Sequence, residues 1–351
     1  MQHKLAFIGY GGMAGWHQFV IRDRVKSIKI KGVFDVREEA LKKAEDEGLK
    51  AYKSLDELLA DKTIDIVIIA TPNNFHKDLA IAALRSGKNV ICEKPVTMNA
   101  GELEEIIAVQ KETGKLFSVH QNRRWDKDFR IIKKIIESDV VGRPYFIESR
   151  VEGSRQYFHG WRDCKMNGGG MLLDWGVHLI DQIMWLIPQK VVSVYAELVS
   201  IYSKEVDDNG KIVIKFEDGL SAHIDLLMNS FVNMTKFRLL AFDGTAVIEN
   251  WDCDGKIVKL LNDKKPIWDE KIVYTAAGPT RSMAPRLPET IKEIKLPNVK
   301  TDAADYYRNF IAVLDKGDEL IVKPEESLRV MKVIDLAFQS HADGRSISCE
   351  I

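Results

Sequence analysis

The sequence predicts an α/β fold in two parts: a doubly wound parallel sheet, then an α+β part built on a large, open, mostly antiparallel sheet. Two observations favour this class. Strand and helix patterns alternate through about the first 120 residues, which is typical of a parallel sheet with helices on both faces. Residues 143–273 then carry short β-rich segments separated by turns. We place the division at residue 121, which gives domains 1–121 and 122–351.

The elements of the first part have recognisable ends. Ser54 is suited to cap a helix N-terminus, and Gly48 to end a helix. Ile64–Ala70 is apolar throughout, as expected of a strand that is covered on both faces. The predicted strands are Leu5–Ile8, Ile28–Phe34, Ile64–Ala70, Asn89–Cys92 and Leu116–Val119, and the predicted helices are Met13–Asp23, Glu38–Glu47, Leu55–Ala60, Lys77–Ser86 and Ala100–Thr113.

The second part is predicted to form its sheet from β-rich segments, with turns such as Asp218-Gly219 between them. A strongly apolar helix is predicted over Met171–Ile187. Residues 274–300 predict an irregular excursion, which reaches the active site, a neighbouring subunit, or neither. The predicted strands are Pro144–Val151, Val191–Ser200, Lys211–Phe216, Ser221–Leu227, Thr235–Ala241 and Thr245–Asn250.

A glycine-rich loop directly follows the first strand. Gly9 and Gly11 are spaced as in nucleotide-binding turns, and Ala14 stands where a small residue lets helix and strand pack closely. The helix that follows offers backbone N–H groups and a partial positive charge to a pyrophosphate. We therefore predict a dinucleotide site of the Rossmann type, formed by Gly9, Gly11, Gly12, Met13 and Ala14.

Asp35 ends the second predicted strand, at the distance expected for a contact to the cofactor's ribose. A carboxylate accepts hydrogen bonds from ribose hydroxyls and repels a 2′-phosphate, so Asp35 favours NAD over NADP. Arg37 weakens this preference for NAD, because a guanidinium can stack on adenine or reach a phosphate. We predict NAD as the cofactor and keep NADP as the alternative.

The loop after Ile64–Ala70 is also predicted to line the cofactor, because open parallel sheets bind ligands at the carboxyl ends of their strands. Asn73 has a second interpretation as a cap of the following helix, and His76 as a local hydrogen-bond partner. The predicted cofactor contacts of this loop are Thr71, Pro72, Asn73 and His76.

Three ionisable residues have the chemistry that oxidation of an alcohol by nicotinamide requires. A base must take the hydroxyl proton, and a cation stabilises the developing alkoxide. Lys94 follows a strand end, so it is expected near the nicotinamide. Asp174 and His178 are four residues apart and share one face of the predicted helix. Burying an Asp–His pair on an apolar helix costs folding free energy, so its presence there indicates a function.

These segments, in this order, resemble the Gfo/Idh/MocA oxidoreductases, which include glucose–fructose oxidoreductase and inositol dehydrogenases. The resemblance covers nearly the whole chain and is carried by the glycine loop, Thr71-Pro72-Asn73, Glu93-Lys94-Pro95, Asn122 to Asp126, Gly168 to Asp181, Tyr306 to Phe310, and Glu325 to Ser340. It implies that Lys94, Asp174 and His178 form the catalytic trio, and that Glu93 and Lys94 lie beside the cofactor. Which of Lys94 and His178 takes the proton stays open.

The resemblance also implies substrate contacts and an assembly. Arg123 matches a substrate-side arginine of inositol dehydrogenases, with Asn122 beside it. Further predicted contacts are Tyr157, Trp161 and Arg162, together with Lys94, Asp174 and His178. In this family the peptide bond that corresponds to Lys94-Pro95 is often cis, and the open face of the second sheet often forms a dimer or tetramer contact. We therefore expect a homodimer or homotetramer that uses this sheet.

The predicted function is NAD-dependent oxidation of a ring hydroxyl of a cyclitol, sugar or glycoside. One alternative is redox-neutral glycoside cleavage by oxidation and elimination, which needs a further base from Tyr157, His159 or His120. Another is a non-catalytic NAD-binding sensor. Asp181 is interpreted as a partner of His178 or as half of a salt bridge between helices. Asp174, His178 and Asp181 have a spacing that could hold a metal, but we predict none.

Composition limits the remaining classes. The formal net charge of -1 does not favour a nucleic acid or an anionic membrane as partner. The N-terminus does not resemble a signal peptide, and no apolar run approaches the roughly 20 residues that span a bilayer. The four cysteines are far apart and form no CxxC pair, which favours reduced thiols and a cytoplasmic location.

Overall fold

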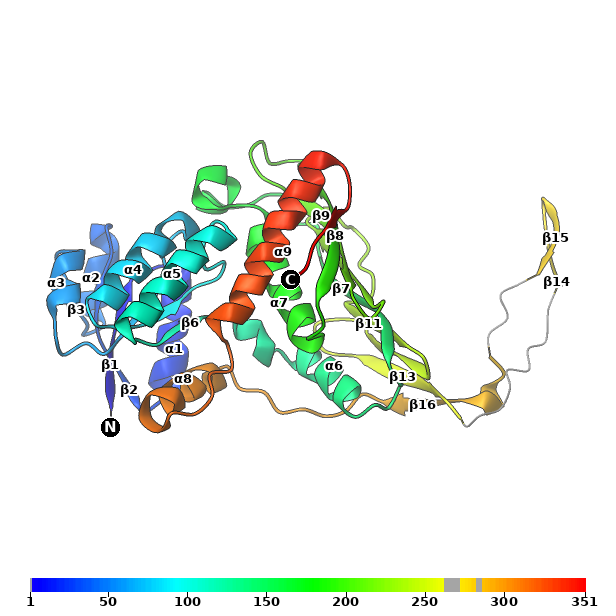
Figure 1. The fold of residues 1–351 in the computed structure, drawn as a ribbon, viewed down its shortest axis with the longest axis horizontal. Helices are drawn as coiled ribbons and strands as arrows, with labels where there is room; N and C mark the ends of the chain where they lie inside the picture. Colours follow the sequence, from blue (N-terminus) through cyan, green and yellow to red (C-terminus); the bar gives the residue numbers. More distant parts are fainter. Residues whose placement is uncertain (1, 262–271, 282–285) are drawn as a thin grey trace.

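The computed structural model describes residues 2–261, 272–281 and 286–351. Figure 1 shows two sheets side by side along the long axis of the molecule, with helices packed between them. The N-terminal sheet has six strands, all parallel to their neighbours, in the order β3-β2-β1-β4-β5-β6. Its strands are β1 (His3–Ile8), β2 (Ile28–Phe34), β3 (Lys50–Ala51), β4 (Ile66–Ile69), β5 (Asn89–Cys92) and β6 (Phe117–Val119).

The helices of this part begin and end where the sequence indicates. Ser54 accepts a hydrogen bond from the backbone N–H of Glu57, and Asn99 accepts one from Glu102. Because helices cover both faces, the residues of β4 are wholly buried. The helices are α1 (Gly12–Arg24), α2 (Glu38–Asp46), α3 (Leu55–Ala60), α4 (His76–Arg85) and α5 (Ala100–Thr113).

The second sheet has nine strands in the order β16-β13-β12-β11-β7-β10-β9-β8-β17. All its pairs are antiparallel except β7–β10, so the predicted fold class is confirmed. Its strands are β7 (Pro144–Glu152), β8 (Val191–Val199), β9 (Asn209–Phe216), β10 (Ser221–Leu227), β11 (Phe237–Ala241), β12 (Gly244–Ile248), β13 (Gly255–Leu260), β16 (Ile291–Lys295) and β17 (Ile347–Ser348).

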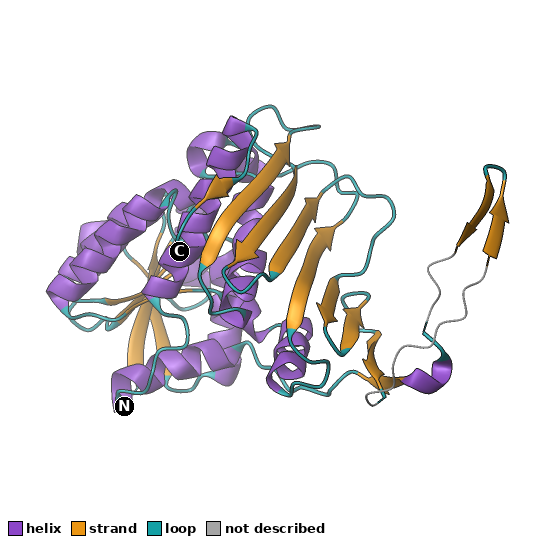
Figure 2. Cartoon of the chain, turned by 45° about the vertical axis from the view of Figure 1, so that its right-hand side comes forward, coloured by secondary structure: helices purple, strands orange, loops and turns teal. Residues whose placement is uncertain are grey.

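Helices cover one face of this sheet and leave the other open (Figure 2). The helices on this face are α6 (Lys127–Glu137), α7 (Val177–Leu186) and α9 (Pro324–Asp343), whereas α8 (Ala304–Lys316) lies against the first part. Helix α9 packs against α5, α7 and β8, and α8 packs against α1, so the C-terminal helices join the two parts. The division at residue 121 stays a prediction.

Three strands of the second sheet, β13, β16 and β17, were not predicted from the sequence. β16 and β17 are the two edge strands and β13 lies beside β16, and most of their side chains are partly exposed, so the alternation of apolar and polar residues is weak there. The predicted excursion over 274–300 contains β16 and part of a separate hairpin, β14 (Ile272–Thr275) with β15 (Gly278–Arg281). Residues 282–285 of that excursion lie outside the described residues.

Candidate active site

The glycine loop turns tightly against the neighbouring strand end. Gly9 has φ +87°, and a Cβ there would lie 2.6 Å from the carbonyl oxygen of Ala70. By contrast, a Cβ on Gly11 or Gly12 would meet no other atom within 4 Å, so the space in front of the α1 N-terminus is open. Met13 and Ala14 lie in the first turn of α1. Exposed N–H groups at an open helix start fit the pyrophosphate of a dinucleotide.

Asp35, just after β2, is bound by protein donors on both carboxylate oxygens. It accepts hydrogen bonds from the backbone N–H groups of Tyr10 (2.7 Å) and Arg37 (2.9 Å) and from the Arg37 guanidinium (3.0 and 3.1 Å). Burial would raise the pKa of Asp35, but these bonds outweigh burial and hold it below its usual value. The predicted ribose ligand is therefore ionised, with Arg37 beside it.

The loop after β4 connects the two parts. The side-chain amide of Asn73 donates to the backbone carbonyl of Gly168 (2.8 Å), and a Cβ on Gly168 would lie 3.0 Å from Asn73 Cβ. Pro72 precedes this short helical turn, and the buried hydroxyl of Thr71 has no hydrogen-bond partner within the described part of the chain. His76 is wholly buried, and its ring nitrogens lie 2.9 and 3.0 Å from the carbonyl oxygens of Pro95 and Thr71. His76 therefore supports the loop from behind.

Lys94 reaches across to the second part of the chain. Its ammonium donates to the Asp174 carboxylate (3.0 Å) and to the backbone carbonyl of the same residue (2.7 Å). The Arg162 guanidinium lies 3.3 Å from the other carboxylate oxygen. Burial would raise the pKa of Asp174, but Lys94 and Arg162 lower it further, so this carboxylate is ionised. The Lys94–Pro95 peptide bond is cis.

His178 lies on the same helical segment, which differs from the predicted continuous α-helix. Residues Leu172–Gly176 form a π-helical turn before α7. Asp207 fixes the start of this turn, because its carboxylate accepts the backbone N–H of Leu172 (2.7 Å). A π-turn is wider than an α-helical turn, and such turns are frequent at functional sites.

The imidazole of His178 is buried, and its Nδ1 has no hydrogen-bond partner among the described residues. Burial, and then the positive charges of Lys94 and Arg123, lower the pKa of His178 well below its usual value. The ring is therefore neutral near pH 7 and able to accept a proton. A buried polar atom without a partner is expected where a ligand completes the site.

The other carboxylate on this helix has a structural role. Asp181 accepts two hydrogen bonds from Arg124 (2.8 and 2.7 Å), and Arg124 also donates to Glu326 (2.6 Å) and to the carbonyl of Ile321 (2.9 Å). Of the two interpretations of Asp181, the salt bridge is therefore the one observed.

The predicted substrate-side residues divide into two groups. The Arg123 guanidinium lies 4.1 Å from the ring centre of Trp175 and pairs with Asp126. The side-chain oxygen of Asn122 is buried, and no described residue forms a hydrogen bond with it. Arg162 stacks on Trp161 and reaches Asp174.

Three other candidates lie differently. Tyr157 is exposed and packs against Tyr202, at a ring separation of 5.1 Å. His159 is exposed in the same loop, and His120 is buried with Nδ1 bonded to Glu93. The structure therefore brings Arg162 into contact with Asp174 and places Arg123 against Trp175 of the same helical segment. Among the hydrogen bonds and ion pairs of the described residues, Tyr157, His159 and His120 have none with Lys94 or Asp174.

Glu93 is the predicted cofactor residue whose side chain points into the core. Its carboxylate accepts hydrogen bonds from His17 and His120, each at 2.8 Å. Sequence reasoning missed His17 and also Tyr307, which bonds to His17 across 290 positions of sequence. No local spacing indicates such pairs.

Comparison with known proteins identifies the family and the fold. Residues 3–121 match the family model for the NAD-binding Rossmann fold of the Gfo/Idh/MocA oxidoreductases, and residues 129–247 match the GFO/IDH/MocA C-terminal domain. The crystal structure of an NAD-binding protein from Listeria innocua is 39% identical with a TM-score of 0.94, covering 99% of each chain.

Among curated proteins, an uncharacterized oxidoreductase (C115.03) of Schizosaccharomyces pombe is 31% identical over 316 residues, covering 86% of this chain and 85% of that protein. A scyllo-inositol 2-dehydrogenase (NADP(+)) of Bacillus subtilis is 26% identical over 360 residues, covering 99% and 96%. In the part of the chain that the structure describes, no helix is both long and apolar enough to cross a membrane. The chain belongs to the Gfo/Idh/MocA family and is an NAD-binding oxidoreductase.

Proposed function

We propose that this protein oxidises a ring secondary hydroxyl of a cyclitol, sugar or glycoside and transfers the hydride to NAD. The observation that carries the proposal is the Lys94–Asp174 contact across the two parts, with buried, neutral His178 on the same helical segment. It unites a cation, an anion and a proton acceptor beyond the carboxyl ends of β4 and β5, where open α/β sheets bind their ligands.

Each group has a role in this reaction. The Lys94 ammonium holds the hydroxyl oxygen and stabilises the alkoxide that develops as the hydride leaves. Asp174 orients Lys94 and the substrate, and either His178 or Lys94 takes the hydroxyl proton. The nicotinamide supplies the hydride acceptor when the cofactor is bound. The named curated relatives that act on inositols support a polyol as the substrate class.

Redox-neutral glycoside cleavage is the less favoured alternative, because it requires another base. His120 is buried and bonded to Glu93, while Tyr157 and His159 are exposed in a loop and have no contact with Lys94, Asp174 or His178 among those found in the described residues. A non-catalytic sensor would have no use for a buried proton acceptor beside a lysine.

The direct test measures formation of reduced nicotinamide after mixing the protein with NAD, and separately with NADP, and a panel of inositols, hexoses and glycosides. Net reduction that depends on the configuration of one hydroxyl would support the dehydrogenase. Release of an aglycone without net reduction would support the cleavage reaction instead. Binding of NAD without either reaction would support the sensor.

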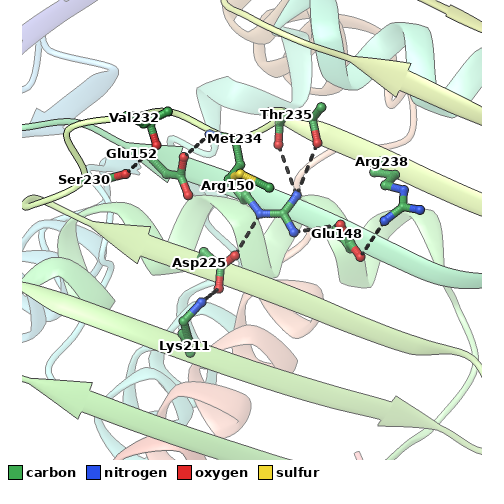
Figure 3. A network of polar contacts seen from close by, with 10 residues as sticks. All are labelled: Glu148, Arg150, Glu152, Lys211, Asp225, Ser230, Val232, Met234, Thr235 and Arg238. Atoms are coloured by element: carbon green, nitrogen blue, oxygen red, sulfur yellow. Dashed lines mark hydrogen bonds and ion pairs between the residues drawn. The ribbon is translucent and has the colours of Figure 1, made fainter. Parts of the chain in front are cut away.

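We also propose that the open face of the second sheet joins two or more copies of the chain. Tyr145, Phe146 and Phe242 form an exposed aromatic cluster there, with ring separations of 5.6 and 5.7 Å. Beside it, Arg150 bonds to Glu148 (2.7 Å) and Asp225 (2.8 Å), and Lys211 extends the network (Figure 3). Aromatic residues and arginine are enriched in protein interfaces relative to the rest of the surface.

Light scattering after size-exclusion chromatography tests this assembly. Phe146→Asp places an unpaired charge in the aromatic cluster and is expected to dissociate the oligomer into monomers. Lys43→Asp, an exposed change on α2 in the first part, should leave the assembly mass unchanged. A monomeric wild-type chain would rule the assembly out.

A further inference from the structure

Four side chains from distant parts of the sequence meet in the core below Lys94. Glu93 follows β5, His17 lies on α1, His120 follows β6, and Tyr307 lies on α8. His17 Nε2 and His120 Nδ1 each lie 2.8 Å from the same oxygen of Glu93, and His17 Nδ1 lies 2.6 Å from the Tyr307 hydroxyl. All four are buried, so none of them is positioned to contact a substrate directly.

Hydrogen-bond partners define the proton positions in this cluster. A carboxylate only accepts, so His17 must carry its proton on Nε2 and His120 on Nδ1. His17 Nδ1 then accepts the Tyr307 hydroxyl proton. Burial and the neighbouring His120 lower the pKa of His17 to about 4, so His17 is a neutral donor near pH 7. Each histidine thus uses one N–H to hold Glu93.

Glu93 transmits this restraint to the next residue. Its second oxygen accepts the backbone N–H of Lys94 (3.2 Å), at the start of the turn that directs the Lys94 side chain toward Asp174. The carboxylate therefore accepts three donors, two of them from elements that flank the predicted cofactor site.

We propose that Glu93 is a positioning residue for Lys94, and that His17 and His120 hold its carboxylate as N–H donors rather than as proton carriers. This inference rests on the proposed function, in which Lys94 contacts the reacting oxygen. A displacement of about 1 Å in a reacting group can cost about 100-fold in rate, so the restraint has a measurable consequence.

The same three side chains form a group that could hold a metal ion, because their ligand atoms lie within 4.8 Å of one another. The 2.8 Å separations are those of N–H···O⁻ hydrogen bonds. Nitrogen and oxygen ligands arranged tetrahedrally at about 2.0–2.1 Å from a zinc ion would stand roughly 3.3 Å apart. The distances therefore favour hydrogen bonds.

Paired substitutions test the proposal. The amide nitrogen of Asn can replace a histidine Nδ1–H, and that of Gln can replace an Nε2–H. His120→Asn and His17→Gln therefore keep the donors, whereas His120→Leu and His17→Leu remove them. We expect the Leu variants and Glu93→Gln to lose about 100-fold in kcat with little change in KM for the polyol, and the Asn and Gln variants to retain most of kcat.

Two other patterns would overturn the proposal. Equal loss in the Asn, Gln and Leu variants would mean that the histidines carry protons or that only their packing matters. Unchanged kcat in Glu93→Gln would mean that the carboxylate does not position Lys94. Affinity for NAD, measured by calorimetry on each variant, shows whether the nucleotide site has remained folded.

Nuclear magnetic resonance of histidine-labelled wild-type protein gives a readout that does not need turnover. Protected ring N–H protons are expected on Nε2 of His17 and on Nδ1 of His120. Each is assigned by its loss in the His17→Leu or His120→Leu variant, because buried His76 also carries a ring N–H close to carbonyl oxygens. Their absence, or their replacement by metal-bound nitrogens, would overturn the inference. If these protons are present but no polyol is oxidised, the proposed function fails while the hydrogen-bonded cluster stands.

Discussion

The ammonium of Lys94 lies 3.0 Å from a carboxylate oxygen of Asp174 and 2.7 Å from the backbone carbonyl oxygen of the same residue. One lysine thus makes two contacts with the π-helical turn of the second part. Because the lysine side chain is only 12% exposed, the pair is shielded from water, and its charges act more strongly on a bound hydroxyl than they would on the surface.

Lys94→Ala should abolish most turnover while NAD still binds. The variant removes the cation that holds the hydroxyl oxygen, and a general acid–base group contributes about 10²- to 10⁴-fold to rate. Steady-state kinetics and NAD titration measure the two quantities separately. Lys77→Ala, which removes a partly exposed ion pair with Glu105 between α4 and α5, is the matched control and should behave as wild type. Full activity in Lys94→Ala would remove this residue from the mechanism.

The pH dependence of alcohol oxidation should reflect the low pKa of His178. An ordinary histidine base would cause kcat/KM to fall below about pH 6.5. Burial, Lys94 and Arg123 lower the pKa of His178, so the plateau should extend to more acidic pH. His178→Asn should lower the plateau itself. A wild-type decline centred at the ordinary value would contradict the arrangement seen here.

The contribution of the buried histidines to folding stability should fall as the pH drops below the ordinary histidine pKa. His17, His76 and His178 are buried with lowered pKa values, so at these positions the unfolded chain binds more protons than the folded chain in this range. Their contribution is therefore constant above about pH 6.5 and decreases toward the folded value of each group, which is about 4 for His17. Buried Asp207, whose pKa is raised to about 7, acts in the opposite direction, so the effect of His17 is measured as a difference between variants.

Urea unfolding at a series of pH values measures this effect. Each such histidine adds up to about 1.4 kcal/mol per pH unit to the slope of unfolding free energy against pH. His17→Gln should remove the contribution of His17 to this slope of unfolding free energy against pH, while keeping the hydrogen bond to Glu93. An identical slope in the wild type and in His17→Gln would show that His17 is not held neutral in the folded chain.

Much of the fold was predictable because its signals are local. Ser54 and the apolar run of β4 mark a helix start and a buried strand by themselves, and the predicted Ile28–Phe34, Asn89–Cys92 and Ala100–Thr113 match the observed elements residue for residue. The glycine loop was likewise predictable, since Gly9 and Gly11 indicate a dinucleotide site only when a strand precedes them and a helix follows.

The supports of the site were not predictable, because their partners are distant in sequence. The π-turn at Leu172–Gly176 depends on Asp207, which holds the Leu172 N–H from 35 positions away. Glu93 looked like a cofactor contact from its place after β5, yet the direction of its side chain is determined by His17 and His120. Periodicity carries no information about such pairs.

Arg124→Met should destabilise the folded chain strongly. The guanidinium is buried and bonded to Asp181 and Glu326, so its removal leaves a buried carboxylate without a partner, at a cost of about 3–5 kcal/mol. Thermal or urea unfolding measures the loss. The double variant Arg124→Met with Asp181→Asn should recover part of it, because the uncompensated charge is gone. Additive losses would show that the two side chains are not coupled.

Arg37→Ala should change the balance between NAD and NADP. The Arg37 guanidinium now lies on Asp35, where it neutralises the carboxylate that would repel a 2′-phosphate. Without it, the Asp35 charge faces the adenosine ribose uncompensated, so affinity for NADP should fall by about tenfold or more while affinity for NAD changes little. Asp35→Asn, which removes the charge but leaves the shape, should favour NADP instead. Calorimetric titration of both nucleotides into wild type and the two variants measures this balance, and parallel changes for NAD and NADP would mean that the Asp35–Arg37 pair does not discriminate between them.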